Sequence, residues 1–300
     1  MTLPEFPHFS EIELSFSGDI REHLRAYPLE ASEYTFTNLF AFGEAYNFKV
    51  SMYKGVLMIL KDKGPVSLFC PVGGEGITDA MDRGIRFIRE YQGPHYFERV
   101  PESFIRAHLM NNENFIYEEE RDHFDYVYDV IELIELKGRK FHDKKNRINA
   151  FRNSYKYEYA SLTPELVREC LEFEHYWCEV RDCRNHPGLR KEQCAIYRML
   201  RNFNSLDIRG GIIRVGGRIA ALTLGEKLLS DTMVIHVEKA NSDIPGLYQA
   251  INQEFLMHEA GDCRFVNREQ DLGVEGLRNA KMSYNPIAFV KKYKVWERRP

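Results

Sequence analysis

The spacing of apolar and polar residues predicts alternating strands and helices through the second half of the chain. Aromatic and polar residues alternate at 155–159, which is typical of a strand with one buried face. Thr163 and Pro164 form a helix start, and apolar residues then recur every three or four positions as far as Cys178. Gly216-Gly217 separates two β-type runs, which predicts a hairpin. The expected order is β-α-α-β-β-β-α-β-α-β, with elements at 155–159, 163–178, 192–203, 206–215, 218–225, 231–237, 247–259, 263–267, 275–283 and 287–295.

The first half of the chain fits the same element order. Its expected elements lie at 12–16, 17–25, 33–46, 48–52, 56–61, 67–70, 78–91, 95–100 and 102–110, with closing strands at 115–119 and 126–134. One order in both halves predicts a duplication, although no repeat is visible residue by residue. We therefore expect an α/β protein with mixed sheets, divided into an N-terminal unit at 1–136, a bridging segment at 137–155 and a C-terminal unit at 156–300.

Composition is that of an ordinary globular protein. Hydrophobic residues make up 44% and charged residues 29% of the 300 positions, which excludes a disordered chain. The net charge of −4 excludes a protein that attracts nucleic acid or anionic membrane with its whole surface. We expect no membrane span and no secretory signal, because no run of 18 apolar residues occurs and the N-terminus lacks a basic stretch followed by an apolar one. A cytoplasmic location follows from this expectation.

The six cysteines form no C-x-x-C pair, and a chain of this length has no need of disulfides for its stability. We expect all of them to be reduced thiols. His175, Cys178 and Cys183 lie close in sequence, but their spacing matches no metal motif, so we expect no metal site.

Five stretches of the chain carry a family likeness, namely residues 137–142, 144–147, 236–240, 246–252 and 267–286. They resemble an uncharacterised bacterial family that is similar to the C-terminal catalytic domain of phosphatidylglycerol lysyltransferases. The resemblance covers nearly the whole chain, and its last stretch is long enough to be specific. It implies two tandem acyl-CoA N-acyltransferase-like units of the Gcn5-related (GNAT) type, a fold shared with the Fem-type aminoacyl-tRNA-dependent peptide ligases. It also implies acyl or aminoacyl transfer to an amine or a hydroxyl.

The sequence departs from this family pattern in one respect. The lysyltransferases carry a large membrane-spanning region before this domain, and the present sequence shows none. We therefore expect a soluble peptide, protein or metabolite as the acceptor at least as readily as a lipid.

Residues 241–248 occupy the place where acyl-CoA-dependent members of the superfamily bind pyrophosphate through a Q/R-x-x-G-x-G/A turn. The stretch offers one glycine, Gly246, while Pro245 lacks an N–H and the charge of Asp243 repels phosphate. This pattern disfavours a tightly bound acyl-CoA cofactor, although Asp243 as a simple helix cap explains it equally well. The donor stays open between aminoacyl-tRNA and acyl-CoA.

Two strand ends carry the polar residues that we assign to the acceptor cleft of this fold. Glu238 ends the fourth strand of the second unit and is a candidate general base, or else a surface partner of Lys239. Asn267, Arg268, Glu269 and Asp271 follow the fifth strand. Arg268 can hold a carboxylate or phosphate, and Glu269 or Asp271 can bind an α-amine; alternatively, the stretch is a solvated loop that stabilises the next helix.

The short helix after this strand supplies two further candidates. Lys281 matches in position the lysine that lies beside the acyl-transfer centre of the Fem-type ligases, where a fixed cation would stabilise an oxyanion. Tyr284 lies where acetyltransferases of this fold often place a general acid. Packing of either side chain against the protein surface is the alternative interpretation.

The bridging segment carries the largest local excess of positive charge, with Lys140, Lys144, Lys145 and Arg147 among its cations. These residues are candidates to bind the phosphates of a tRNA or of a nucleotide donor. The alternative is a solvated helix that pairs with the acidic run at 118–122.

The leading hypothesis is an acyl- or aminoacyltransferase that moves an aminoacyl group to an amine or hydroxyl of a small molecule, peptide or lipid, with aminoacyl-tRNA as one candidate donor. Catalysis would be direct attack by the acceptor, with no metal and no covalent enzyme intermediate. The alternatives are an acetyl-CoA-dependent N-acetyltransferase and a non-catalytic module that binds RNA or peptide on the same fold.

Overall fold

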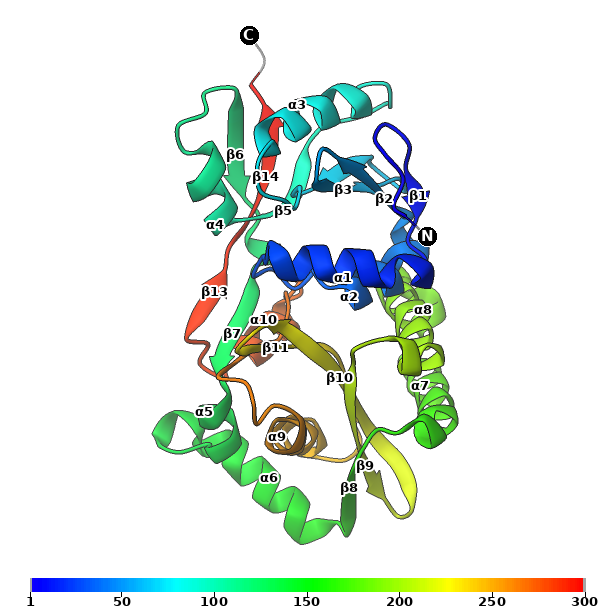
Figure 1. The fold of residues 1–300 in the computed structure, drawn as a ribbon. Helices are drawn as coiled ribbons and strands as arrows, with labels where there is room; N and C mark the ends of the chain where they lie inside the picture. Colours follow the sequence, from blue (N-terminus) through cyan, green and yellow to red (C-terminus); the bar gives the residue numbers. More distant parts are fainter. Residues whose placement is uncertain (1, 299–300) are drawn as a thin grey trace. The chain divides into compact units, whose positions relative to one another are not determined.

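The computed structural model describes residues 2–298 and divides into two compact units (Figure 1). Unit 1 comprises Met1–Asp125, Gln270–Gly273 and Val290–Pro300, and unit 2 comprises Tyr126–Glu269 and Val274–Phe289. Each unit is built on one mixed sheet covered by helices, so the α/β class expected from the sequence is confirmed.

The sheet of unit 1 has the strand order β1-β2-β3-β4-β5-β14-β6. Its strands are β1 (Ser10–Glu11), β2 (Phe48–Tyr53), β3 (Val56–Lys61), β4 (Ser67–Phe69), β5 (Phe97–Pro101), β14 (Lys292–Glu297) and β6 (Phe115–Glu119). Its helices are α1 (Ser17–Ala26), α2 (Phe36–Tyr46), α3 (Ile77–Ile88) and the single turn α4 (Glu102–Phe104).

The sheet of unit 2 has the order β8-β9-β10-β11-β12-β7-β13. Its strands are β8 (Tyr157–Ser161), β9 (Arg209–Val215), β10 (Arg218–Leu229), β11 (Thr232–Ala240), β12 (Phe265–Asn267), β7 (Asp125–Asp129) and β13 (Ala288–Val290). The helices are α5 (Val130–Glu135), α6 (His142–Ser154), α7 (Val167–Val180), α8 (Pro187–Arg201), α9 (Leu247–Glu259) and α10 (Glu275–Met282).

The two sheets share one strand order, and each receives its sixth strand from the other half of the chain. In both sheets the fourth and fifth strands, β4–β5 and β11–β12, pair in parallel, and the fifth pairs with the sixth in antiparallel sense. The sixth strand of unit 1 is β14, from the end of the chain, and that of unit 2 is β7, from the end of the first half. In Figure 1 the exchange is visible as the red strand β14 beside the cyan β5.

The expected elements differ from the structure where the chain crosses between units. The single strand expected at 126–134 is β7 followed by helix α5, whose first turn is capped by the Asp129 side chain at the Glu132 N–H. The strand expected at 287–295 is divided into β13 and β14. The units observed therefore differ from the ranges 1–136 and 156–300 because β7 and β14 each pair in the sheet of the other half.

A buried ion cluster fixes β14 within unit 1. The Lys292 side chain is fully buried, and its ammonium donates to Glu33 Oε2 at 2.5 Å and to Asp125 Oδ1 at 2.7 Å. Asp125 also accepts from the Ser32 N–H at 2.8 Å and from its hydroxyl at 3.0 Å. Burial raises the pKa of Glu33, and the Lys292 charge opposes that rise. The last strand is thus joined by charge to residues near the start of the chain.

Helix α9 forms the centre of unit 2. It packs against β9, β10 and β11 and buries Leu247, Ile251 and Phe255 completely. Phe255 lies directly beneath Gly225, where a Cβ atom would approach the Val234 carbonyl oxygen to 2.5 Å. The close approach of the β11 backbone to β10 therefore requires glycine at this position.

The cysteine prediction is wrong for one pair. Cys178 and Cys183 form a disulfide, because α7 ends at Val180 and the chain reverses through Asp182, which has a positive φ of 51°. Cys70, Cys170 and Cys263 are free and buried, and Cys194 is free and exposed.

Between residues 2 and 298, no helix is long and apolar enough to cross a lipid bilayer. Within the same range no group of three or more His, Cys, Asp or Glu side chains could hold a metal ion.

Substitution Lys292→Met is expected to destabilise the protein by about 3–5 kcal/mol, because it removes the buried cation between Glu33 and Asp125 and leaves Glu33 with Arg99 alone. The matched control is the neighbouring Lys291→Met, which removes a half-exposed pair with Glu119 and should cost about 0–1 kcal/mol. Urea unfolding of both variants measures the difference. Equal stability of the two variants would show that the cluster does not hold β14.

Candidate functional site

Strands β11 and β12 part in the middle of the unit 2 sheet. Their parallel pairing begins at Thr232 and Phe265 and ends at Val234 and Asn267, while β11 continues to Ala240 beside β10. Residues beyond this point on either strand lie at an opening between neighbouring strands. The point where neighbouring strands of an α/β sheet part is a common place for a ligand.

A buried ion pair spans the opening. The guanidinium of Arg268 donates to Glu238 Oε1 at 2.8 Å, and the two side chains are only 11% and 15% exposed. The second carboxylate oxygen of Glu238 accepts from the side-chain amide of Asn252 on α9 at 2.9 Å. Both oxygens of Glu238 are therefore engaged, which fixes the orientation of Arg268.

Two tyrosine rings enclose the Arg268 guanidinium. Its central carbon lies 4.7 Å from the ring centroid of Tyr284 and 5.7 Å from that of Tyr128. Burial lowers the pKa of the Arg268 guanidinium. The Glu238 carboxylate and the two phenols raise it by more, so the net effect is a raised pKa. Within the described chain, Nη1 of Arg268 is buried and has no hydrogen-bond partner. Arg268 thus remains a cation, and the N–H bonds of its buried Nη1 are not used within the described chain.

Tyr284 is buried in the same site. Burial raises the pKa of its hydroxyl to about 12, against the opposing charge of Arg268. The phenol therefore keeps its proton at neutral pH and can act as a hydrogen-bond donor or a general acid.

Lys281 ties helix α10 to the end of β12. Its ammonium donates to the backbone carbonyl of Arg268, and the Tyr128 hydroxyl donates to the backbone carbonyl of Lys281 at 2.9 Å. The Arg268 N–H donates to the Tyr126 carbonyl on β7 at 2.9 Å. The structure thus brings together Glu238, Arg268, Lys281 and Tyr284 within unit 2.

Lys144 adds a second cation beside Tyr284. Its ammonium lies 4.5 Å from the Tyr284 ring centroid and donates to the Ser283 hydroxyl at 2.6 Å. Burial, together with the charges of Arg147 and Arg268, lowers the pKa of Lys144. The start of α6 therefore extends the positive charge of the site.

The remaining cations of the bridging segment have different surroundings. Lys140 pairs with Glu132 at 2.7 Å, whereas Lys145 and Arg147 are exposed and form no ion pair within residues 2–298. The acidic run at 118–122, which was the alternative partner, pairs within unit 1: Glu119 with Lys291 and Glu120 with Lys294.

The other residues expected after β12 have protein partners. The Asn267 side chain is fully buried and accepts from the Glu269 N–H at 2.8 Å. Glu269 binds Nδ1 of His236 at 2.7 Å. Asp271 lies in unit 1, where it binds Arg121 at 3.3 Å and accepts from the Gly273 N–H at 2.8 Å. The structure therefore does not place these three side chains with the Arg268 ion pair as ligand-facing groups.

Sequence reasoning gave no role to three contributors, namely His236, Asn252 and Tyr128. Each contacts a residue that did receive a role, namely Glu269, Glu238 and Arg268 in turn, and the two contacting residues lie far apart in the sequence. No local pattern distinguishes such a residue from an ordinary position on a strand or helix.

A buried carboxyl group lies on α7, on a separate part of unit 2. The Glu174 side chain is fully buried, and neither of its oxygens has a hydrogen-bond partner within the described residues. The pKa of Glu174 is raised to about 7. Burial is the largest cause, the charge of Lys239 opposes it, and the charge of Glu192 adds to it. Lys239 itself is bound to Glu192 at 2.6 Å and lies 3.9 Å from the Trp177 ring centroid.

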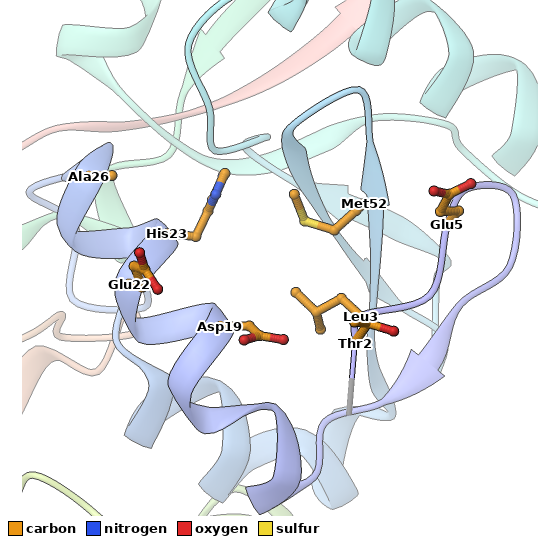
Figure 2. Close-up of a pocket in the computed structure, with 8 residues that line it drawn as sticks. All are labelled: Thr2, Leu3, Glu5, Asp19, Glu22, His23, Ala26 and Met52. Atoms are coloured by element: carbon orange, nitrogen blue, oxygen red, sulfur yellow. The ribbon is translucent and has the colours of Figure 1, made fainter.

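A pocket of about 470 Å³ opens in unit 1 between the start of the chain, α1 and β2 (Figure 2). Figure 2 shows Asp19, Glu22 and His23 along one side of it and Met52 opposite. None of the residues assigned to the strand opening of unit 2 lines this pocket. Its acidic wall disfavours a phosphate-bearing ligand.

Comparison with known proteins places these features in a family. The sequence profile described as "Phosphatidylglycerol lysyltransferase, C-terminal" matches residues 24–296. A conserved protein of unknown function from Bacteroides thetaiotaomicron is 33% identical, with a TM-score of 0.90, 99% of this chain covered and 100% of that chain.

One more distant relative matches in structure and another in sequence. The C-terminal domain of a putative lysylphosphatidylglycerol synthetase from Agrobacterium fabrum is 13% identical, with a TM-score of 0.68 over 94% of this chain and 92% of that one. An uncharacterised protein from Mycoplasmoides gallisepticum is 22% identical over 181 residues, which are 57% of this chain. The chain spans 55% of the length of that relative.

Substitution Glu174→Gln is expected to alter how stability depends on pH. The folded-state pKa of about 7 lies above the usual 4.5, so wild-type stability falls as pH rises from about 4.5 through 7, by about 3 kcal/mol. The glutamine variant does not titrate, so its stability relative to wild type should grow by that amount between pH 4.5 and pH 8. Urea unfolding across this range measures the difference.

The matched control is Glu172→Gln, two residues away on α7, where the carboxylate is exposed and pairs with Arg168. Its difference from wild type should stay nearly constant with pH. A constant difference for Glu174→Gln as well would contradict a raised pKa at this position.

Proposed function

The chain belongs to the family defined by the C-terminal domain of phosphatidylglycerol lysyltransferase, and from this premise we propose that it transfers an aminoacyl group from aminoacyl-tRNA to an amine or hydroxyl acceptor. The observation that carries the proposal is the Arg268–Glu238 ion pair, with its unpartnered N–H, at the point where β11 and β12 part. The lysyl group is the first to test, because the relative from Agrobacterium fabrum is described as a putative lysylphosphatidylglycerol synthetase.

In the proposed reaction the acceptor attacks the ester carbonyl that joins the aminoacyl group to the terminal ribose. A bond forms between the acceptor atom and the carbonyl carbon, the ester bond to the ribose oxygen breaks, and the proton lost by the acceptor ends on that oxygen. The free Nη1–H of Arg268 would stabilise the negative charge on the carbonyl oxygen. The Tyr284 hydroxyl, which keeps its proton at neutral pH, would pass this proton to the ribose oxygen and take up the proton that the acceptor loses.

Glu238 has a positioning role in this proposal rather than that of a general base. Its two oxygens accept hydrogen bonds from Arg268 and Asn252, so the carboxylate orients these two side chains. Lys281 likewise acts through Arg268, since its ammonium binds the backbone carbonyl of that residue.

The surroundings of α9 support an aminoacyl-tRNA donor over acyl-CoA. A Cβ atom on Gly246, at the start of α9, would lie 2.3 Å from the carbonyl oxygen of Arg147 and 3.0 Å from Phe151. Helix α6 therefore packs against the helix start that binds pyrophosphate in acyl-CoA-dependent members of the superfamily, and it presents a carbonyl there, which repels phosphate. The outer face of α6 carries exposed cations that would instead bind the phosphates of tRNA.

The acceptor is proposed only as a class, an amine or hydroxyl on a small molecule, peptide or lipid. The reaction would take place in the cytoplasm, where aminoacyl-tRNA is available.

Transfer from radiolabelled lysyl-tRNA to a panel of amine and hydroxyl acceptors tests the site. Arg268→Ala is expected to lower kcat at least about 100-fold, because it removes a donor to the developing oxyanion. Lys281→Ala should lower kcat by displacing the Arg268 backbone. Arg264→Ala, an exposed arginine just before β12, is the matched control and should keep full activity. Unchanged transfer in Arg268→Ala would refute the site.

Binding of tRNA tests the basic helix. The double variant Lys145→Ala/Arg147→Ala should weaken binding and reduce the slope of log K against log salt by about 2, because about one phosphate contact is lost per residue. The double variant Arg168→Ala/Arg218→Ala, which removes two exposed cations elsewhere in unit 2, should leave that slope unchanged. A stabilising thermal shift with acetyl-CoA but none with lysyl-tRNA would favour the acetyltransferase alternative, and binding of tRNA without turnover would favour the non-catalytic one.

A further inference from the structure

A buried histidine links three segments beside the strand opening of unit 2. Nε2 of His236 on β11 lies 2.9 Å from Glu226 Oε1 on β10, and Nδ1 lies 2.7 Å from Glu269 Oε1 just after β12. The side chains of His236 and Glu226 are 0% and 6% exposed, and that of Glu269 is 17% exposed. We call Glu226, His236 and Glu269 together the histidine clamp.

The clamp crosses the sheet where its hydrogen-bonded ladder is interrupted. The β10–β11 register shifts between Leu224 and Gly225, opposite His236, and the β11–β12 pairing stops at Val234 and Asn267. Backbone pairing therefore does not hold the end of β12 to β11 beyond this point. The side chain of His236 provides that connection instead.

The chain after β12 has a backbone conformation that needs support. Glu269 has a φ of 55°, in the left-handed region that residues with a Cβ rarely adopt. Its N–H is held by the Asn267 side chain at 2.8 Å, and its carboxylate is held by His236. Arg268 lies between these two anchored residues, so the direction of its side chain depends on them.

The histidine carries a charge that strengthens both bonds. Burial alone would remove it, but hydrogen bonds to Glu226 and Glu269 outweigh burial and raise the pKa of His236 to about 10. An imidazolium donates from both nitrogens, which matches two carboxylate acceptors. Glu226 on β10 and Glu269 after β12 are the charged groups that act on it within the described residues.

We propose that His236 is a positioning residue for Arg268, which it holds toward Glu238 by anchoring Glu269 at the point where β11 and β12 part. This inference rests on the proposed function, in which the N–H of Arg268 faces the reacting carbonyl. His236 does not touch substrate itself, since its side chain is fully buried and both ring nitrogens are engaged. Glu269 is accordingly part of the support of the site rather than the ligand of an α-amine.

The experiment measures the Arg268 guanidinium directly. In wild-type protein labelled with ¹⁵N, its side-chain N–H signals should be protected from exchange, because the group is buried and bound to Glu238. In His236→Gln these signals should be lost, and kcat for transfer from lysyl-tRNA should fall about tenfold or more while the KM for tRNA stays unchanged. The control is His258→Gln, on the outer part of α9, which should leave both measurements as in wild type.

Glu226→Gln provides a second test that needs only a small change in the core. Loss of one carboxylate should bring the titration of His236 into the range of pH 6 to 9, visible in its ring NMR signals. The protected Arg268 signals should be present at the acidic end and disappear as His236 loses its proton, whereas wild type shows no change over this range.

The experiments distinguish failure of the positioning role from failure of the proposed function. Protected Arg268 signals in a folded His236→Gln variant, or their persistence in Glu226→Gln while His236 titrates, would overturn the positioning role whatever the activity. Absence of transfer by wild type from every aminoacyl-tRNA offered would remove the proposed function and the kinetic part of this inference, and the NMR result would still decide whether the clamp orients Arg268.

Discussion

Each sheet of this protein is completed by a strand from the other half of the chain, and the rest of the structure depends on that exchange. The Lys292 ammonium, buried between Glu33 and Asp125, holds β14 in the sheet of unit 1. The opposite exchange places β7 in unit 2, between β12 and β13. Neither half can complete its own sheet alone, so folding of one unit requires residues from both ends of the sequence.

The exchanged strand β7 also builds the candidate site. Its Tyr126 carbonyl accepts from the Arg268 N–H, its Tyr128 ring lies against the Arg268 guanidinium, and the Tyr128 hydroxyl binds the Lys281 carbonyl. The site is therefore assembled from the end of the first half and the last strands of the second. A duplication without strand exchange would lack this support around the arginine.

Charge at the strand opening is arranged so that one buried guanidinium nitrogen has no protein partner among the described residues. The carboxylates of Glu238 and Glu269 are each bound to a cation, Arg268 and His236 respectively, and both pairs are largely buried. A buried ion pair contributes little net stability, because desolvation offsets the attraction, but it fixes orientation. In this site the fixed group is a guanidinium with an unpartnered N–H, next to a tyrosine that keeps its proton. The arrangement suits stabilisation of an oxyanion better than proton abstraction.

The sequence alone determined the α/β class, the order of most elements and the placement of polar residues at two strand ends, because these features follow from local periodicity, turn residues and chain order. It also indicated Glu238, Arg268, Lys281 and Tyr284, which meet in one site since neighbouring strand ends and the next helix start at the same edge of a sheet.

Only the tertiary structure decided which partner each of these residues has. The exchange of β7 and β14, the Cys178–Cys183 disulfide, the clamp on Glu269 and the location of Asp271 in unit 1 all join segments whose pairing is not encoded by their local pattern. The local sequence pattern around a carboxylate at a strand end is the same whether the carboxylate binds a ligand or a histidine. Sheet register and burial decide which partner the carboxylate has, because they determine which charged groups lie within hydrogen-bond distance of it.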